Sequence, residues 1–568
     1  MPPAQDNTMQ SPESFVALST SATPTKSAHG KRFRWVAGIA AACGIVGLTV
    51  GLVALTKTDN SYHSVSTALQ QTTALKINLV IKQTTMVPVG GANTATIYAI
   101  PSATSTDGHL QFDATVAFPD PVDADRTIEY TIVANKAYMA TRVGDDLTSV
   151  QCVDPAQVPS FSLIQTSLAQ ATVVDSVQIA DAAVQGGACD GTWLQAKFMG
   201  ERYVACKSFA DQITSIEGQD VSLTIEYVDD SSAFPAIQVP TAVDGSRAMC
   251  ADLPVAPIES KSLTQRATEA MDVMSLTPRT ASIFSPSCGC KLPKKKPCLF
   301  VHGLGNLFAG EMTNSFPFYW GWIHDNAPCC SSIKFVHFDT INQGWDDTKL
   351  QDQFCDAALQ VSAGASGNTL GDLLLVTHSM GNTIASGAIA SGRCQADASK
   401  LTWVSLAAPM QGSKTVNLMQ YECTTGGWNS IIKDPATFLG VCPPARAFVS
   451  MQHMSTVNQD MHAKFTAAQN VRTKYVTHAA CGNNDWGLNT IYSLPLFTVG
   501  EWAKHDSAND GLVDWNSCTA GLNPSAFGGS TTSKFYAGPL NHADLTFRNI
   551  DGLFGDNRKP TKWFKCAV

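Results

Sequence analysis

The spacing of apolar residues changes abruptly about halfway along this chain of 568 residues. From Ser61 to Met274 the pattern has a period of two, as in ALKINLVIKQ at 74–83 and VSLTIEYV at 221–228. Such runs, bounded by Gly, Asp and Pro, are typical of an antiparallel sheet with one buried face. From Cys298 onward, continuous apolar runs alternate with helical segments, which is typical of a parallel sheet covered on both faces. The sequence therefore predicts a β-rich domain followed by an α/β domain.

The same pattern predicts the domain boundaries and the strands. The β-rich domain is expected at 57–274 and the α/β domain at 298–568. Residues 275–297 are rich in Pro, Lys and Cys and are interpreted as a linker. Further β-rich runs lie at 94–100, 109–118 and 127–141, and the buried strands of the α/β domain are predicted at 298–303, 332–339, 372–381, 400–409 and 472–482.

A run of 22 residues without a charge, Trp35 to Thr56, lies near the start of the chain. At 1.5 Å per helical residue it is long enough to cross a hydrocarbon core of about 30 Å. Basic residues cluster before the run at 26–34, and Lys57 is the basic residue close behind it. The positive-inside rule then predicts a cytoplasmic, disordered tail at 1–34, a signal anchor at 35–56, and lumenal or extracellular domains of a type II membrane protein. A buried core helix is the alternative.

Charge and cysteine content restrict the partners and the compartment. The formal net charge is −9 and only 15% of residues are charged, so the chain lacks the basic surface that nucleic-acid binding requires. There are 17 cysteines, and with Cys43 in the predicted span 16 remain in an oxidising compartment, where disulfides form. Two internal bridges are expected in the β-rich domain, among Cys152, Cys189, Cys206 and Cys250.

One pentapeptide lies where a buried strand meets a small-residue helix: Thr377-His378-Ser379-Met380-Gly381. It resembles the nucleophile elbow G-x-S-x-G of the α/β-hydrolase superfamily, with Thr377 in place of the first glycine. The resemblance implies an α/β-hydrolase fold for 298–568, with a mostly parallel sheet and helices on both faces. It also implies that Ser379 is a nucleophile.

His302-Gly303-Leu304-Gly305 follows the first strand of this domain and resembles the oxyanion loop of lipases and esterases. The resemblance implies that the backbone N–H groups of Leu304 and Met380 stabilise the oxyanion. His302 is interpreted as a residue that supports the loop rather than as a base.

Two late segments, Asn509-Asp510-Gly511-Leu512-Val513 and Asn541-His542-Ala543-Asp544, resemble segments of the calcium-dependent bacterial triacylglycerol lipases. The resemblance implies that Asp510 is the orienting acid and His542 the general base. LAAPMQGS at 406–413 also resembles these lipases, so the likeness covers only the C-terminal half. Asp544 stands where the lipases place a calcium ligand, and a structural aspartate that supports the histidine loop is the alternative, because no motif locates a second ligand.

Several alternatives stay open at this point. Asp506 and Asp514 compete with Asp510, and the competitors of His542 are His453, His462, His478 and His505. The insertion at 410–470, with a Cys423–Cys442 bridge, is either a lid or a pair of capping helices. The aromatic segment 316–325 is either a pocket wall or core.

The combined pattern predicts a membrane-anchored serine hydrolase that cleaves lipid or other apolar esters through Ser379, His542 and Asp510. No cofactor is expected to be required, with calcium at most a structural ion. An acyltransferase or thioesterase with the same triad is the alternative. A non-catalytic receptor or adhesion ectodomain is a more distant one.

Overall fold

The structure is a computed structural model in which the described residues belong to one compact unit. It describes residues 60–568 except 88–90, 106–108, 120–124, 154, 156–157, 159–160, 175, 180–188, 242–244, 246, 256, 258–279, 284–287, 308, 322, 426–443, 489 and 491. The predicted tail at 1–34 and the predicted span at 35–56 lie outside the described residues. Among the residues that are described, no helix has the length and apolarity needed to cross a membrane.

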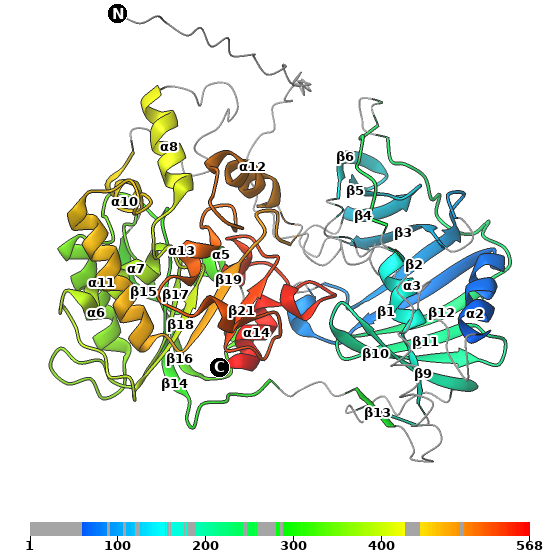
Figure 1. The fold of residues 1–568 in the computed structure, drawn as a ribbon, viewed down its shortest axis with the longest axis horizontal. Coiled ribbons are helices and arrows are strands. Elements are labelled where there is room, and N and C mark those ends of the chain that lie inside the picture. The colour runs from blue at the N-terminus through cyan, green and yellow to red at the C-terminus, as the bar shows by residue number, and fades with distance from the viewer. Residues whose placement is uncertain are drawn as a thin grey trace, which may run out of the picture. The chain divides into compact units, whose positions relative to one another are not determined.

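The N-terminal half forms the expected β-rich antiparallel domain (Figure 1). Its eleven-stranded sheet has the order β6-β5-β4-β3-β2-β1-β12-β11-β10-β9-β7. The strands are β1 (Ala74–Ile81), β2 (Thr94–Pro101), β3 (Phe112–Pro119), β4 (Arg126–Val133), β5 (Lys136–Val143), β6 (Asp146–Cys152), β7 (Thr172–Val174), β9 (Gly191–Phe198), β10 (Glu201–Ser208), β11 (Ile213–Gly218) and β12 (Val221–Val228). The run at 127–141 is a hairpin of two strands, because Ala134 and Asn135 both adopt positive φ at a two-residue turn.

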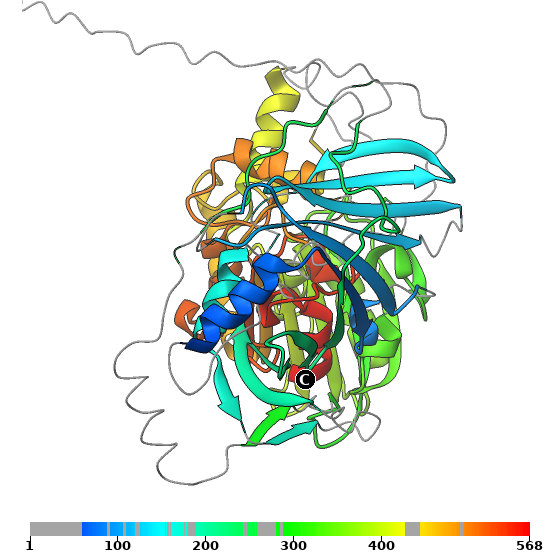
Figure 2. The same ribbon diagram turned by 90° about the vertical axis from the view of Figure 1, so that its right-hand side faces the viewer.

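Two helices cover the apolar face of this sheet, α2 (Asn60–Gln71) and α3 (Phe161–Ala169) (Figure 2). Val65 and Leu69 of α2 and Ile164 and Leu168 of α3 are buried in one core with the inward-facing strand residues. The period of two thus separates a buried face from a polar face, as antiparallel sheets commonly do.

The C-terminal half contains the mostly parallel sheet. Its order is β15-β16-β14-β17-β18-β19-β21-β20, and only the edge strand β15 runs antiparallel to its neighbour. The strands are β14 (Lys296–Val301), β15 (Gly310–Thr313), β16 (Cys330–His337), β17 (Leu373–His378), β18 (Leu401–Leu406), β19 (His478–Gly482), β20 (Phe527–Gly528) and β21 (Phe535–Gly538). The prediction of a strand over 472–482 is wrong in its first half, because helix α11 continues to Tyr475 and β19 begins only at His478.

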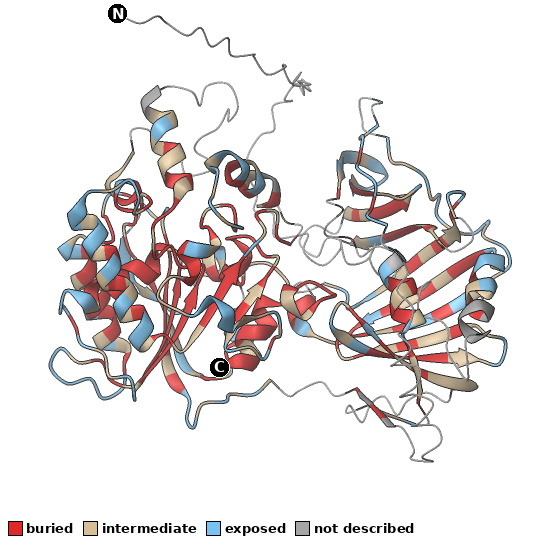
Figure 3. Cartoon of the chain, in the orientation of Figure 1, coloured by how far each residue is buried: buried red, intermediate tan, exposed pale blue. Residues whose placement is uncertain are grey.

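Helices cover both faces of the second sheet, and its central strands β17 and β18 are buried along their whole length (Figure 3). One core joins α6, α7 and α11 to the sheet, and a second core on the opposite face contains Trp320 of α5 and Phe564 of α14. The helices are α5 (Pro317–Trp320), α6 (Thr348–Val361), α7 (Met380–Ala390), α8 (Lys414–Thr425), α10 (Arg446–Ser450), α11 (Gln459–Tyr475), α12 (Ser493–Ala503), α13 (Trp515–Thr519) and α14 (Pro560–Ala567).

Disulfides join segments within each half. The two bridges expected in the β-rich domain are present, as Cys152–Cys250 and Cys189–Cys206. Between described cysteines of the C-terminal half there are five more, at Cys288–Cys566, Cys290–Cys329, Cys298–Cys330, Cys355–Cys394 and Cys481–Cys518. Cys423 is also disulfide-bonded, but Cys442 lies outside the described residues. The predicted linker contains a short strand, β13 (Thr280–Ile283), which pairs with β8 (Ser176–Ile179).

The last part of the chain also contributes to the β-rich domain. Leu553 and Phe554 are buried in the core of the eleven-stranded sheet. Nearby, Asp220 in the turn between β11 and β12 accepts hydrogen bonds at 2.8 Å and 2.9 Å from the Nζ of Lys562, and it also pairs with Lys559. Although burial opposes ionisation of Asp220, the two ammonium groups lower the pKa of its carboxyl below the ordinary value. The cluster is therefore a buried set of compensating charges.

Removing the carboxylate of this cluster should destabilise the protein strongly. The substitution Asp220→Asn leaves Lys562, which is 2% exposed, as an uncompensated buried cation. Breaking a buried pair in this way costs about 3 kcal/mol or more, to be measured as the free energy of unfolding in denaturant. The control is Glu226→Gln in the exposed Lys76–Glu226 pair, where the loss should stay below about 1 kcal/mol. Equal losses in the two variants would contradict the assignment.

Candidate active site

Ser379 lies in a sharp turn between strand β17 and helix α7. Its backbone has φ 53° and ψ −132°, a conformation that residues other than glycine seldom adopt. Its N–H donates to the carbonyl of Leu406 at 3.0 Å, at the end of the neighbouring strand β18. Conformations of this kind cost about 1–3 kcal/mol and persist where the surrounding structure enforces them, often at functional sites. The turn presents Ser379 at the carboxyl edge of the sheet.

Gly381 allows this turn to lie close to strand β14. A Cβ at Gly381 would be 2.6 Å from the carbonyl oxygen of Val301 and 2.8 Å from that of His302. Any side chain at this position would therefore push the start of α7 away from the oxyanion loop.

Thr377, which replaces the first glycine of the motif, is accommodated because its hydroxyl has specific partners. The hydroxyl accepts a hydrogen bond from the indole Nε1 of Trp403 at 2.8 Å and donates one to Oδ1 of Asn382 at 2.6 Å. The Nδ2 of Asn382 in turn donates at 3.0 Å to the carbonyl oxygens of both Ser379 and Leu406. Asn382 thus holds the turn closed, a role that the motif did not indicate.

Asp510 and His542, which are 32 residues apart, form a buried pair. The Nδ1 of His542 lies 2.8 Å from Oδ2 of Asp510, and the exposed fractions are 6% and 0%. The other carboxylate oxygen accepts the N–H groups of Leu512 at 3.1 Å and Val513 at 2.7 Å. Gly511 permits this tight turn, because its φ is 95° and a Cβ at this position would lie 2.8 Å from the Cβ of Leu496. The arrangement fixes the carboxylate and, through it, the orientation of the imidazole.

The competing acids lie elsewhere. Asp506 is largely exposed and pairs with Lys414. Asp514 accepts the N–H of Ser517 at the start of α13 and lies 3.7 Å from Nδ1 of His505.

The competing histidines also have other surroundings. His453 contacts Ser455 through Nδ1, His478 contacts Thr477, and His505 contacts Thr415. His462 is exposed on α11. Only His542, among these described histidines, contacts Asp510.

The backbone of His542 is tied to the residue before Ser379. The Nε2 of His378 lies 3.0 Å from the carbonyl oxygen of His542, and the two imidazole rings are 4.7 Å apart between centroids. Because Ser379 follows His378 directly, this contact holds the loop that contains His542 beside the turn at Ser379.

The predicted oxyanion loop, residues 302–305, contacts Ser379 through Gly303. A Cβ at Gly303 would lie 2.5 Å from Cβ and 3.0 Å from Oγ of Ser379, so only glycine fits. The carbonyl of Gly303 accepts hydrogen bonds at 2.8 Å from Nδ1 of His302 and from the hydroxyl of Thr340. Because a trans peptide points its N–H opposite to its carbonyl, these bonds set the direction of the Leu304 N–H.

His302 is neutral and supports the loop. Its Nε2 accepts the N–H of Phe338 at 3.0 Å, so its single proton is on Nδ1. Complete burial lowers the pKa of His302 to about 4. The second predicted donor, Met380, is the first residue of α7, where N–H groups have no partner within the helix.

Both carboxylate oxygens of Asp544 accept hydrogen bonds from neighbouring residues. Its Oδ2 accepts the N–H groups of Leu488 and Asn541, both at 2.9 Å, and its Oδ1 accepts Nδ2 of Asn549 at 2.8 Å. These three donors suit an anion, and among the described residues no group of three or more His, Cys, Asp or Glu side chains has the arrangement of a metal site. The predicted calcium-ligand role of Asp544 therefore does not fit its surroundings, and the structural alternative agrees with them.

The roles of two segments, 316–325 and 410–470, were left open by the sequence, and each segment has parts with different surroundings in the structure. In the aromatic segment 316–325, Trp320 is core, Phe318 is exposed, and Tyr319 hydrogen-bonds the oxyanion loop. Of the insertion at 410–470, α11 packs in the core against α7. Because 426–443 lie outside the described residues, the lid stays a prediction.

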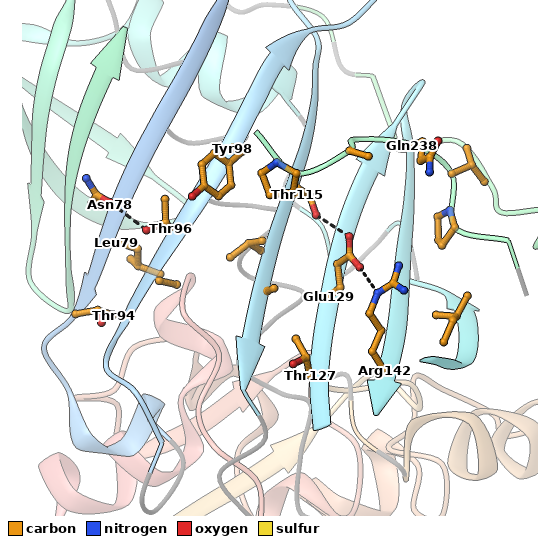
Figure 4. Close-up of a pocket in the computed structure, with 18 of the residues that line it drawn as sticks. Asn78, Leu79, Thr94, Thr96, Tyr98, Thr115, Thr127, Glu129, Arg142 and Gln238 are labelled. Carbon is orange, nitrogen blue, oxygen red and sulfur yellow. Dashed lines mark hydrogen bonds and ion pairs between the residues drawn. The ribbon is translucent and has the colours of Figure 1, made fainter. Parts of the chain in front are cut away.

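The β-rich domain has a pocket of about 1150 Å³ on the polar face of its sheet (Figure 4). Glu129 in this pocket accepts hydrogen bonds from Thr115 and from Arg142, and Thr96 donates to Asn78. The described residues that line it include no Ser, Cys or His. The described residues that line the pocket therefore offer no serine–histidine or cysteine–histidine pair.

Comparisons with known proteins leave the function to be argued from this geometry. No family model matches the chain, and no curated protein matches it. Among solved structures, dipeptidyl peptidase 4 of Porphyromonas gingivalis is matched with 9% sequence identity and a TM-score of 0.19, over 77% of this chain and 70% of that chain.

Asn382 should be required for a stable nucleophile turn. The substitution Asn382→Ala leaves the buried carbonyls of Ser379 and Leu406 and the hydroxyl of Thr377 without this partner. We expect the free energy of unfolding to fall by about 1–3 kcal/mol, measured by chemical denaturation. Asn516→Ala, at an exposed position of α13, should change it by less than about 0.5 kcal/mol. A change at Asn382 as small as at Asn516 would contradict the role.

Asp544 should make stability depend on pH and not on calcium. Burial raises the pKa of Asp544 from 3.8 to about 7, so the folded chain binds this proton more tightly than the unfolded chain. The contribution of Asp544 to the free energy of unfolding is thus largest at acidic pH and is lost as pH rises through about 7. In denaturation curves between pH 4 and 8, Asp544→Asn should remove this part of the slope, whereas Asp145→Asn at an exposed turn should not. Destabilisation of the wild type by a chelator would contradict the interpretation of Asp544 as a structural residue that does not bind calcium.

Proposed function

We propose that residues 298–568 form an α/β-hydrolase domain that cleaves carboxylic esters through Ser379, His542 and Asp510. The main support is the combination of a strained serine at the carboxyl edge of a parallel sheet with a buried histidine–carboxylate pair whose loop is bound to the serine turn. Serine requires an adjacent base to act as a nucleophile, and that base requires an orienting partner.

In the proposed reaction, Oγ of Ser379 attacks the ester carbonyl carbon while His542 accepts the hydroxyl proton. Asp510 holds the imidazole through Nδ1, which leaves Nε2 for the proton transfer. The carbonyl oxygen becomes an oxyanion, stabilised by the N–H groups of Leu304 and Met380. His542 then gives the proton to the leaving alcohol, and water cleaves the acyl-enzyme by the same steps.

The distribution of exposed apolar side chains favours lipid or other apolar esters. Among the described residues of 298–568, the large exposed hydrophobic residues are Leu307, Phe318, Tyr421, Val449, Phe497 and Trp502. They lie in the connections that leave the carboxyl ends of β14, β18 and β19, and none lies on α6, α7, α11 or α14. Helices α8, α10 and α12, which carry four of them, gather at one end of the sheet (Figure 1). Exposed apolar patches of this kind are typical of ligand or membrane contacts.

The disulfides indicate that the described domains fold in an oxidising compartment, outside the cytosol. We propose that residues 35–56 anchor them to a membrane as a type II protein. An anchored enzyme would meet lipid substrates at that membrane.

Covalent labelling tests this function. A fluorophosphonate probe should label the wild type, and Ser379→Ala should abolish labelling, because the probe reacts only with an activated serine. Asp510→Asn should slow labelling by several orders of magnitude, since the comparable change in a Ser-His-Asp enzyme costs about 10⁴-fold. Ser507→Ala, at a half-buried serine outside the site, is the control and should label like the wild type.

Absence of labelling in the wild type, or labelling of Ser379→Ala equal to the wild type, would overturn the proposed function. With labelling established, release of free acid from short and long acyl esters identifies a hydrolase. Transfer of the acyl group to an added alcohol or thiol in preference to water would identify an acyltransferase.

A further inference from the structure

Three hydrogen bonds run in series from the oxyanion loop to the histidine loop. The N–H of Gly303 donates to the hydroxyl of Tyr319 at 2.8 Å. That hydroxyl lies 2.6 Å from Nδ1 of His378, and Nε2 of His378 lies 3.0 Å from the carbonyl oxygen of His542. The series thus joins the segments that carry Leu304 and His542 by way of the residue next to Ser379.

The direction of every bond in the series is fixed by chemistry. A backbone carbonyl only accepts, so Nε2 of His378 must carry the proton that it donates to the carbonyl of His542. Because the imidazole is neutral, Nδ1 is then unprotonated, and the hydroxyl of Tyr319, which accepts from the N–H of Gly303, donates its own proton to Nδ1. Only one tautomer of His378 is compatible with the three hydrogen bonds. The N–H of Gly303, the hydroxyl of Tyr319 and Nε2 of His378 each donate one proton in the series.

Both side chains keep these roles across the working pH range. Complete burial raises the pKa of Tyr319 to about 12. Burial, with smaller contributions from His542, Arg548 and His302, lowers the pKa of His378 well below its ordinary value. Tyr319 therefore keeps its proton and His378 does not gain a second one between acidic and mildly alkaline pH.

The position of Tyr319 is set by contacts to its ring and to its hydroxyl. The guanidinium of Arg548 lies 4.9 Å from the ring centroid, and Arg548 follows His542 in the same loop. The Nε of Arg548 donates to the hydroxyl of Thr546 at 2.6 Å. A Cβ at Gly303 would be 3.0 Å from both the Tyr319 hydroxyl and Oγ of Ser379, so the two hydroxyls flank the same glycine.

We propose that Tyr319 and His378 are positioning residues that set the spacing between the oxyanion loop and the loop of the general base. The proposal rests on the function proposed above. Neither residue exchanges a proton with substrate. Each acts through another group, Tyr319 through the Gly303 N–H and His378 through the His542 carbonyl. Because displacements of about 1 Å cost up to about 100-fold in rate, this spacing is expected to limit kcat.

The test uses Tyr319→Phe and His378→Gln in the full chain, with Tyr475→Phe at the end of α11 as the matched control. Active sites are first counted by the stoichiometry of fluorophosphonate labelling, so that kcat refers only to folded enzyme. Hydrolysis of p-nitrophenyl butyrate then gives kcat and KM across pH 5–9. We expect Tyr319→Phe to lower kcat per labelled site about 10- to 100-fold, with KM nearly unchanged and the midpoint of the pH profile unmoved.

The double variant Tyr319→Phe/His378→Gln distinguishes a series from two separate contacts. Residues of one hydrogen-bond network show non-additive effects, so the double variant should be about as slow as the slower single variant. Multiplication of the two losses would overturn the proposal, as would an unchanged kcat per labelled site in Tyr319→Phe. If Tyr319→Phe fails to fold, kcat per labelled site of His378→Gln is compared with that of the wild type instead. An unchanged value would then overturn the proposal.

Failure of the wild type to label overturns the proposed function and this proposal with it. Normal labelling of the wild type with unaffected variants overturns this proposal alone. A loss of kcat in Tyr475→Phe equal to that in Tyr319→Phe would show a non-specific effect and would likewise overturn it.

Discussion

The candidate site depends on the close approach of two backbone segments, the start of helix α7 and the end of strand β14. A Cβ at Gly381 would collide with the carbonyl oxygen of Val301, and a Cβ at Gly303 would collide with Ser379. Each segment therefore has a glycine where it meets the other. Because no side chain separates them, the serine and the oxyanion loop are in direct contact, and Asn382 closes the turn from the helix side. The positive φ of Ser379 is a consequence of this packing.

A second constraint ties the C-terminal half to the β-rich half. The segment that follows the histidine loop supplies Leu553 and Phe554 to the core of the eleven-stranded sheet, and then Lys559 and Lys562 to the carboxylate of Asp220. The same stretch continues into α14, whose Cys566 is bonded to Cys288 before β14. The C-terminal segment thus belongs to two cores at once, and the β-rich domain stabilises the part of the chain that leads away from His542.

The sequence predicts the fold where local periodicity determines it and fails where distant contacts do. The alternation at 74–83 and the continuous run at 372–381 correspond to β1 and β17, because each pattern matches the burial of one or both faces. At 472–482 the apolar run crosses a helix end, and only packing against α7 decides that α11 continues to Tyr475. The pairing of Tyr319 with His378 spans 59 residues, so no motif indicates it. His378, a polar residue inside a buried strand, was the available hint.

The three histidines around Gly303 and Ser379 differ in a way that assigns their roles. His302 and His378 are each bound at both ring nitrogens by neutral partners, and burial lowers the pKa of both. A proton taken up by either one would be buried without a carboxylate and would break a hydrogen bond to the loops. His542 alone among these three has a carboxylate, Asp510, at Nδ1. His542 is therefore the imidazole available for the proposed proton transfer. His302 and His378, as neutral donors and acceptors, hold the backbone segments on which that transfer would depend.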